Sequence, residues 1–274
     1  SQGIKVGSDV IKYSEIGIGK YVKQAVKDVN SWHNGGNTHL GSIMLFTPLA
    51  AAAAILKKHE GKVKVDSLRK EATKVMESTT NEDALEFYGA ISSLNIGWLG
   101  QIRSKDLPDI GSSKSLNQIE ESGSTFFEIM KFSSEWDGIA RELTNGLSAS
   151  FKIGYPSFIK TYKETEDVNM ATVNTFLKIL SEIPDTFIAR KIGLDITKDI
   201  SEAVKMGMPI SRTISEKSKK ILDDHNGMLS TRGKKEIEKM DEELRRSAGH
   251  LNPGTTADIT AASLMIALLT GFRV

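Results

Sequence analysis

The chain has 274 residues, of which 39% are hydrophobic and 26% charged, and its formal net charge is +1. This is the composition of a soluble globular protein, and so small a net charge excludes a global field that steers the chain to nucleic acid or a membrane. The absence of cysteine excludes disulfides, a thiolate nucleophile and zinc–thiolate sites.

Residues 1–18 show no periodic pattern and are predicted to be irregular. Apolar residues at helical spacing then predict helices over 19–32, 65–78 and 80–94. The alanine-rich run 42–58 is apolar nearly all round, which predicts a buried helix that Pro48 kinks or delays. The longest apolar runs, near 43–56 and 259–269, are shorter than the ~20 residues that span a bilayer. The first residues lack the apolar core of a signal peptide, so we expect a cytoplasmic protein.

The second half continues the helical pattern. Residues 100–117 break all periodicity and are predicted to be a connecting loop or a lid. The sequence 223–227, Asp-Asp-His-Asn-Gly, is typical of a turn, and a cation site is its alternative. Helices are predicted over the remaining segments: 124–146, 156–163, 168–183, 184–193, 196–206, 214–222, 230–247 and 254–269. The first of these segments forms either two helices or one bent helix.

About eleven helices with short links predict an all-α fold, a single multi-helix globular domain over residues 19–274. The two nearly apolar helices, after Gly41 and after Gly254, are predicted to form a buried central pair.

A glycine-led polar segment precedes the first of these apolar helices. It contains Gly36, Asn37, Thr38 and His39. Glycines allow a close approach of the backbone, and the N–H groups and dipole of a helix start favour a bound anion such as phosphate. A plain glycine turn with Asn37 or Thr38 as N-cap is the alternative.

A second polar loop of the same design, residues 252–258, enters the other apolar helix. It reads Asn252-Pro253-Gly254-Thr255-Thr256-Ala257-Asp258. A third motif, 184–193, carries Asp185 at a helix start and the cations Arg190 and Lys191, which together indicate a carboxylate and two cations at the edge of a pocket. The alternative is a short helix whose charged residues only match the dipole at its two ends. Donors for phosphates, together with carboxylates for a metal or a proton, suggest a polyphosphate nucleotide site.

These three motifs, in this order, resemble the triphosphoribosyl-dephospho-coenzyme A synthase family, in particular its archaeal-type members. The resemblance lies in Gly-Asn-Thr-His-Leu-Gly at 36–41, in Pro-Asp-Thr with Arg-Lys-Ile-Gly within 184–193, and in Leu-Asn-Pro-Gly-Thr-Thr-Ala-Asp at 251–258. It implies an all-helical enzyme that transfers a triphosphoribosyl group from ATP to the 2′-hydroxyl of 3′-dephospho-CoA, or of a related nucleotide acceptor, and releases adenine.

The resemblance also implies roles for individual residues. Asp185, Asp258 and His39 are the expected catalytic residues, and Asp185 and Asp258 are the expected ligands of Mg²⁺. The expected contacts to phosphate or substrate are Gly36, Asn37, Thr38, Arg190, Lys191, Asn252, Gly254 and Thr255. The expected partners are ATP and the nucleotide acceptor, without nucleic acid or membrane, and a homodimer is allowed.

Two alternatives stay open at this point. One is a nucleotide N-glycosidase or phosphoribosyl-type enzyme with another acceptor. The other is a non-catalytic helical module that binds a nucleotide. Family members usually begin with a Pro-Gly element that has no counterpart before Gly19, and this difference keeps the second alternative open.

Overall fold

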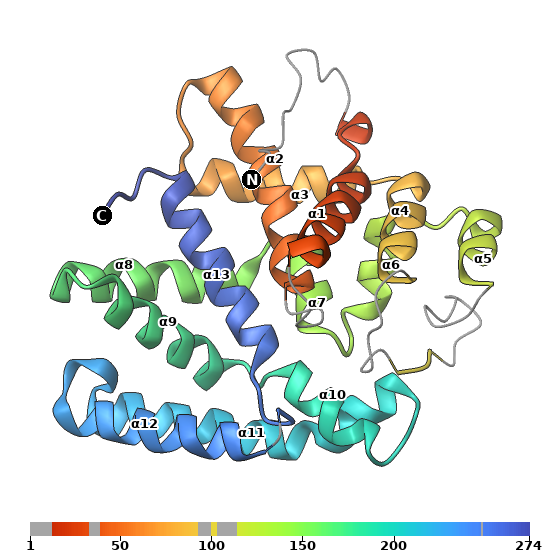
Figure 1. Ribbon diagram of the computed structural model, residues 1–274. Helices are drawn as coiled ribbons and strands as arrows, with labels where there is room; N and C mark the ends of the chain where they lie inside the picture. Colours follow the sequence, from red (N-terminus) through yellow and green to blue (C-terminus); the bar gives the residue numbers. More distant parts are fainter. Residues whose placement is uncertain (1–12, 33–38, 93–99, 103–113, 248) are drawn as a thin grey trace. The chain divides into compact units, whose positions relative to one another are not determined.

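The computed structural model describes residues 13–32, 39–92, 100–102, 114–247 and 249–274, and within these ranges the regular structure is helical, with no β-strand (Figure 1). The all-α prediction is therefore confirmed. The chain divides into two compact units, residues 1–147 and 148–274, and each is described by itself. The prediction of one domain over 19–274 stays a prediction.

The first unit contains seven α-helices and one 3-10 turn in its described residues. They are η1 (Tyr13–Glu15), α1 (Ile18–Trp32), α2 (Leu40–Glu60), α3 (Val65–Glu77), α4 (Asn81–Ser92), α5 (Ser115–Ser122), α6 (Phe126–Ser133) and α7 (Gly138–Thr144). Helix α2 packs against α1, α3 and α7, and Leu45, Leu49 and Ala52 in it have no exposed surface. Its length and composition would suffice to cross a membrane, but half of its apolar window is buried, as in the core helix of a soluble protein.

A buried carboxylate joins two helix starts in this unit. One oxygen of Asp83 accepts a hydrogen bond from the N–H of Gly19 (2.8 Å), and the other accepts one from the N–H of Thr80 (2.8 Å). A Cβ at Gly19 would lie 2.1 Å from the carbonyl oxygen of Asp83, so the start of α1 requires glycine at this contact.

The second unit contains η2 (Ser150–Gly154, a π-helical turn), α8 (Tyr155–Thr165), α9 (Val168–Glu182), α10 (Thr186–Leu194), α11 (Ile200–His225), η3 (Gly227–Leu229), α12 (Thr231–Arg246) and α13 (Gly254–Leu269). Leu180, Ile188, Ile214 and Met240 form a core shared by α9, α10, α11 and α12. Helix α13 packs on α8, α9 and α10, and its Ile266 and Ala267 are fully buried. Each apolar helix thus contributes buried residues to the core of its own unit, and the predicted pairing of the two helices stays a prediction.

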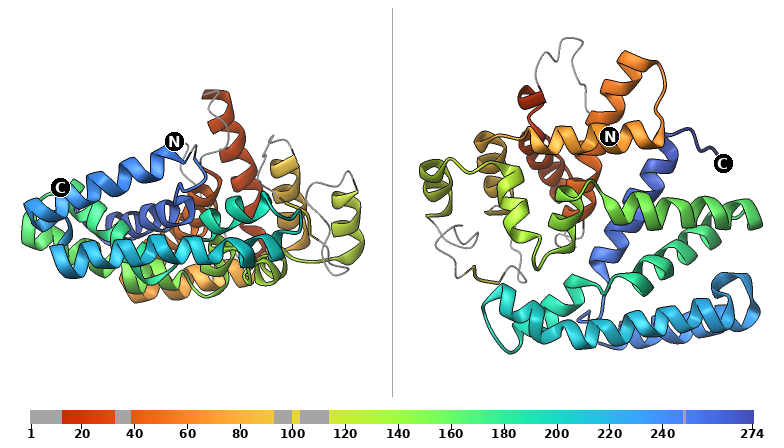
Figure 2. Two further views of the ribbon diagram at one scale, coloured as in Figure 1. Left: turned by 90° about the horizontal axis from the view of Figure 1, so that it is seen from below. Right: turned by 180° about the vertical axis from the view of Figure 1, so that it is seen from behind.

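Helix α11 corrects a prediction, because it is continuous where the sequence suggested two pieces, 196–206 and 214–222. It runs through Pro209 over 26 residues beside α10 and α12 (Figure 2). Its backbone lies close to α10: a Cβ at Gly207 would lie 2.0 Å from the carbonyl oxygen of Ala189, and one at Gly193 would lie 1.8 Å from that of Ala203. This packing outweighs the local cost of Pro209.

Three smaller predictions are also decided. The loop expected over 100–117 ends earlier, because α5 begins at Ser115; residues 103–113 lie outside the described part. The turn expected over 223–227 is confirmed only at its end: residues 223–225 belong to α11, and the chain turns at Asn226, which adopts a left-handed conformation (φ 58°). Residues 124–146 form two helices, α6 and α7.

Candidate functional site

Asp185 links two of the predicted motifs. It is the N-cap of α10, where one carboxylate oxygen accepts hydrogen bonds from the N–H groups of Phe187 (2.8 Å) and Ile188 (3.0 Å). The other oxygen accepts from the N–H (2.7 Å) and the hydroxyl (2.8 Å) of Thr256, in the first turn of α13. Asp185 is 1% exposed. One buried carboxylate therefore fixes the starts of two helices relative to each other.

Buried hydroxyl groups extend this link. The hydroxyl of Ser211, on α11, donates to the carbonyl oxygen of Asp185 (2.8 Å). The hydroxyls of Thr186 and Thr255 lie 3.2 Å apart and share a hydrogen bond. Sequence reasoning did not single out Ser211 or Thr256. The available signal for Ser211 was the row of small residues Gly207, Ser211, Ser215 and Ser218, which permits close helix packing.

Lys191 fastens the loop before α13. Its ammonium group donates to the carbonyl oxygens of Gly249 and, at 3.4 Å, Asn252. The same group lies 4.3 Å from the ring centroid of Phe187, within the range of a cation–π contact. Only 3% of Lys191 is exposed. Burial lowers the pKa of this amine to about 8, against the opposing effect of the negative charge of Asp185.

Phe187 and Gly254 complete the contact between α10 and α13. A Cβ at position 254 would lie 2.7 Å from Cδ1 of Phe187, so glycine allows the ring to pack against the start of α13. The guanidinium carbon of Arg190 lies 5.8 Å from the centroid of the same ring. Residues 185–191 and 249–256, separate in the sequence, thus form one packed cluster, which we call the α10–α13 cluster.

The four donors to Asp185 limit what this carboxylate can do. They occupy both of its oxygens, so in this arrangement it offers no acceptor position to a metal ion. Burial raises its pKa, while the hydrogen bonds from Thr256, Ile188 and Phe187 oppose the rise. Three of its donors are backbone N–H groups that can only donate, which favours the ionised carboxylate. The predicted metal role of Asp185 is untested, but this geometry fits a structural role better.

The other predicted residues lie at different places. Asp258 is the fifth residue of α13 and is half-buried; Asn252 is exposed and Thr255 is buried. His39 is the exposed residue before α2, in the other unit, and its position relative to the α10–α13 cluster is not described. Gly36, Asn37 and Thr38 lie outside the described residues.

Among the described residues, no group of three or more His, Asp or Glu side chains gathers as a metal cage. Mg²⁺ in nucleotide enzymes is usually held by one or two carboxylates together with substrate phosphates, so a cage is not required. The predicted Mg²⁺ contact of Asp258 stays a prediction.

The chain matches the family of ATP:dephospho-CoA triphosphoribosyl transferases over residues 3–273. A solved structure from Archaeoglobus fulgidus, assigned as a triphosphoribosyl-dephospho-CoA synthase, has the same fold: the TM-score is 0.66, with 24% sequence identity over 93% of this chain and 90% of that one. A search of curated proteins finds no match.

Proposed function

The chain belongs to the ATP:dephospho-CoA triphosphoribosyl transferase family, and from this premise we propose that the first turns of α13 and the loop 249–253 line its substrate site. The enzyme transfers a triphosphoribosyl group from ATP to dephospho-CoA. The observation that supports our placement is the α10–α13 cluster, in which Asp185 and Lys191 both hold the segment that leads to Asp258. Such fastening preorganises a site before substrate arrives.

The reaction defines the groups that the site must supply. The bond from C1′ of the ATP ribose to adenine breaks, adenine keeps the electron pair, and an acceptor hydroxyl forms the new bond to C1′. The hydroxyl proton needs a base, and positive charge that develops on the ribose needs a nearby carboxylate. We assign Asp258 to one of these tasks or to Mg²⁺, which offsets the triphosphate charge when it is bound.

The start of α13 would receive the phosphates. The dipole of a helix favours an anion at its N-terminus, and α13 begins at Gly254, beside the predicted contacts Asn252 and Thr255. The N–H groups of Gly254, Thr256 and Ala257 already donate to oxygen atoms of the protein, so side chains such as Asn252 would supply contacts to the phosphates. Lys191 would act indirectly here, because its ammonium group is already bound to two carbonyl oxygens of the loop. The substrate contacts predicted for Asn37, Thr38, His39 and Arg190 stay predictions, and we infer a cytoplasmic location.

The experiment is incubation with ATP, Mg²⁺ and dephospho-CoA, with adenine measured by chromatography and the product by mass spectrometry. We expect one adenine for each dephospho-CoA that gains a triphosphoribosyl group, and loss of both when Mg²⁺ is chelated. Equal adenine release without dephospho-CoA would indicate a nucleotide N-glycosidase, and nucleotide binding without any adenine release would indicate a binding module.

The variant Asp258→Asn tests the assigned residue. We expect adenine release to fall by a factor on the order of 100 or more, with the thermal midpoint almost unchanged, because asparagine has nearly the same size and shape as aspartate. Asp167→Asn is the matched control: Asp167 caps α9 through Met170 and should leave turnover unchanged. Normal turnover in Asp258→Asn would contradict the assignment.

A further inference from the structure

One side of α11 carries an apolar stripe that no described element covers. Met206, Pro209 and Thr213 are exposed at helical spacing, and Ile210 lies beside them. Met206 is 43% exposed and Ile210 44%. Single exposed apolar residues are ordinary, but neighbours on one helix face form a contact surface.

Charged residues flank this stripe at both ends. Glu202 and Lys205 precede it, and Glu216 and Lys220 follow it, and all four are exposed. Glu202, Met206, Pro209, Thr213, Glu216 and Lys220 are spaced alternately by four and three residues, the spacing at which one helix packs along another.

The order of these charges is complementary to itself. When a second α11 is laid antiparallel about a two-fold axis level with residue 211, Glu202 faces Lys220 of the second copy and Lys205 faces its Glu216. The same two pairs recur on the other side of the axis, and the apolar residues meet between them. Such a self-matching patch is the requirement of a two-fold interface.

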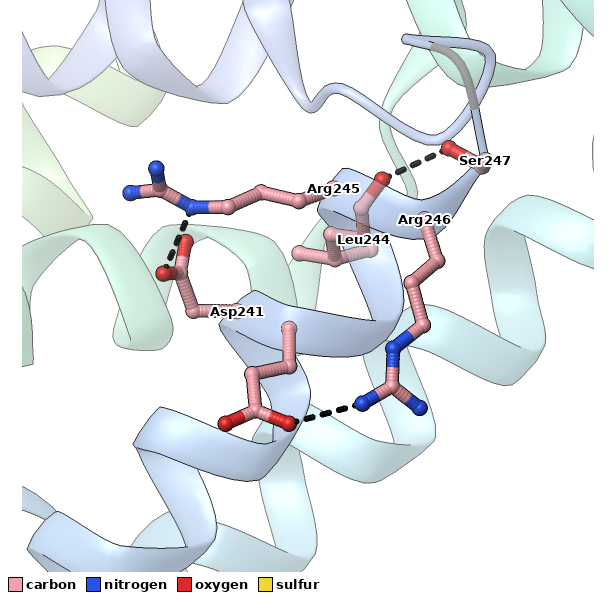
Figure 3. Close-up of polar contacts among 6 residues, drawn as sticks. Asp241, Leu244, Arg245, Arg246 and Ser247 are labelled. Atoms are coloured by element: carbon pink, nitrogen blue, oxygen red, sulfur yellow. Dashed lines mark hydrogen bonds and ion pairs between the residues drawn. The ribbon is translucent and has the colours of Figure 1, made fainter.

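Helix α12 provides a contrast on the same unit. Several of its outward charges are paired within the helix, among them Asp241 with Arg245 and Glu242 with Arg246 (Figure 3). On α11, by comparison, Lys205, Glu216 and Lys220 form no ion pair with any other residue that the structure describes. Lys205, Glu216 and Lys220 are therefore available to a partner, whereas the Glu202 carboxylate already accepts a hydrogen bond from the hydroxyl of Thr197 (2.8 Å).

We propose that the enzyme forms a two-fold dimer in which this face of α11 packs antiparallel on the same face of a second copy. From residue 202 to residue 220 the contact is about 27 Å long at 1.5 Å per residue. A single helix pair of that length falls at the lower end of stable interface sizes, so the dimer dissociates on dilution.

Sedimentation velocity of the full chain over a concentration series tests this proposal. The wild type should be dimeric at concentrations on the order of 100 µM, in the range where weak complexes form. Lys205→Glu places two glutamates face to face, and Glu216→Lys places two lysines face to face, so each variant alone should be monomeric. The double variant restores both pairs and should again be dimeric.

An equimolar mixture of the two single variants gives the sharpest result. The glutamate introduced at position 205 of one variant then meets the lysine introduced at position 216 of the other, and the second pair is native, so a heterodimer should form from two monomeric proteins. This outcome also shows that both variants are folded. Arg245→Glu, on α12, is the control and should leave the dimer intact. A monomeric wild type, dimeric single variants, a mixture that stays monomeric, or a control that dissociates would each overturn the proposal.

Discussion

The hydroxyl of Thr256 offers the most direct test of the α10–α13 cluster. It donates one of the four hydrogen bonds to the buried Asp185 carboxylate, at 2.8 Å. Thr256→Val keeps the shape of the side chain and the backbone N–H bond but removes this donor. A hydrogen bond to a charged group contributes about 1.5–3 kcal/mol, so we expect a loss of about 2 kcal/mol and a thermal midpoint lower by about 4–8 °C.

Thr260 is a matched control one turn further along α13. Its side chain is also buried, but its hydroxyl donates only to the carbonyl oxygen of Thr256 in its own helix (2.8 Å). Thr260→Val therefore carries the same chemical change and a smaller cost, about 0.5–1.5 kcal/mol. Thr256→Ser, which keeps the donor, should recover most of the loss.

Two measurements distinguish positioning from simple stability. Thermal unfolding gives the midpoints, and the initial rate of adenine release at a temperature well below them gives the effect on turnover. If the cluster positions the start of α13, kcat falls in Thr256→Val and stays near wild type in Thr260→Val. Equal midpoints and equal rates in the two valine variants would refute the reasoning.

Further predictions concern Lys191 and the glycines. The pKa of Lys191 is about 8 in the folded chain against 10.5 for the free amine, so folding releases protons between these pH values and the contribution of Lys191 to stability should rise with pH across that window. From pH 8 to pH 10, the thermal midpoint of the wild type should therefore rise relative to that of Lys191→Met. A difference in midpoint that does not change with pH would contradict this. Gly254→Ala forces a methyl group against Phe187 and should cost about 1–3 kcal/mol in urea unfolding. Gly89→Ala, in α4, meets no atom closer than 3.7 Å and should instead stabilise the chain by about 0.5–1 kcal/mol, so the two alanine variants should differ in sign.

The sequence by itself determined the local structure around the site. Pro184 and Asp185 predict the start of a helix, and Asp185 does cap α10 through the N–H groups of Phe187 and Ile188. The loop at 252–254 likewise predicts the start of α13, at Gly254. These features depend on hydrogen bonds between residues two to four positions apart, so a short stretch of chain is sufficient to specify them.

Where the local pattern conflicted with packing, the sequence was misleading. The pattern indicated two helices, 196–206 and 214–222, yet α11 is continuous through Pro209, because Gly207 lets α10 and α11 approach at backbone distance. Lys191 was predicted to contact phosphate, which stays a prediction; what the local pattern did not indicate is that the loop at 249–252 and the ring of Phe187 enclose its ammonium group.

Only the tertiary structure decided what the second oxygen of Asp185 binds. An N-cap engages one oxygen, and nothing within reach in the sequence determines the partner of the other. Its partner, Thr256, lies 71 residues away and meets Asp185 only because α13 packs beside α10. A buried carboxylate is tolerated where every acceptor position is filled, and that condition depends on how whole helices assemble rather than on any local pattern.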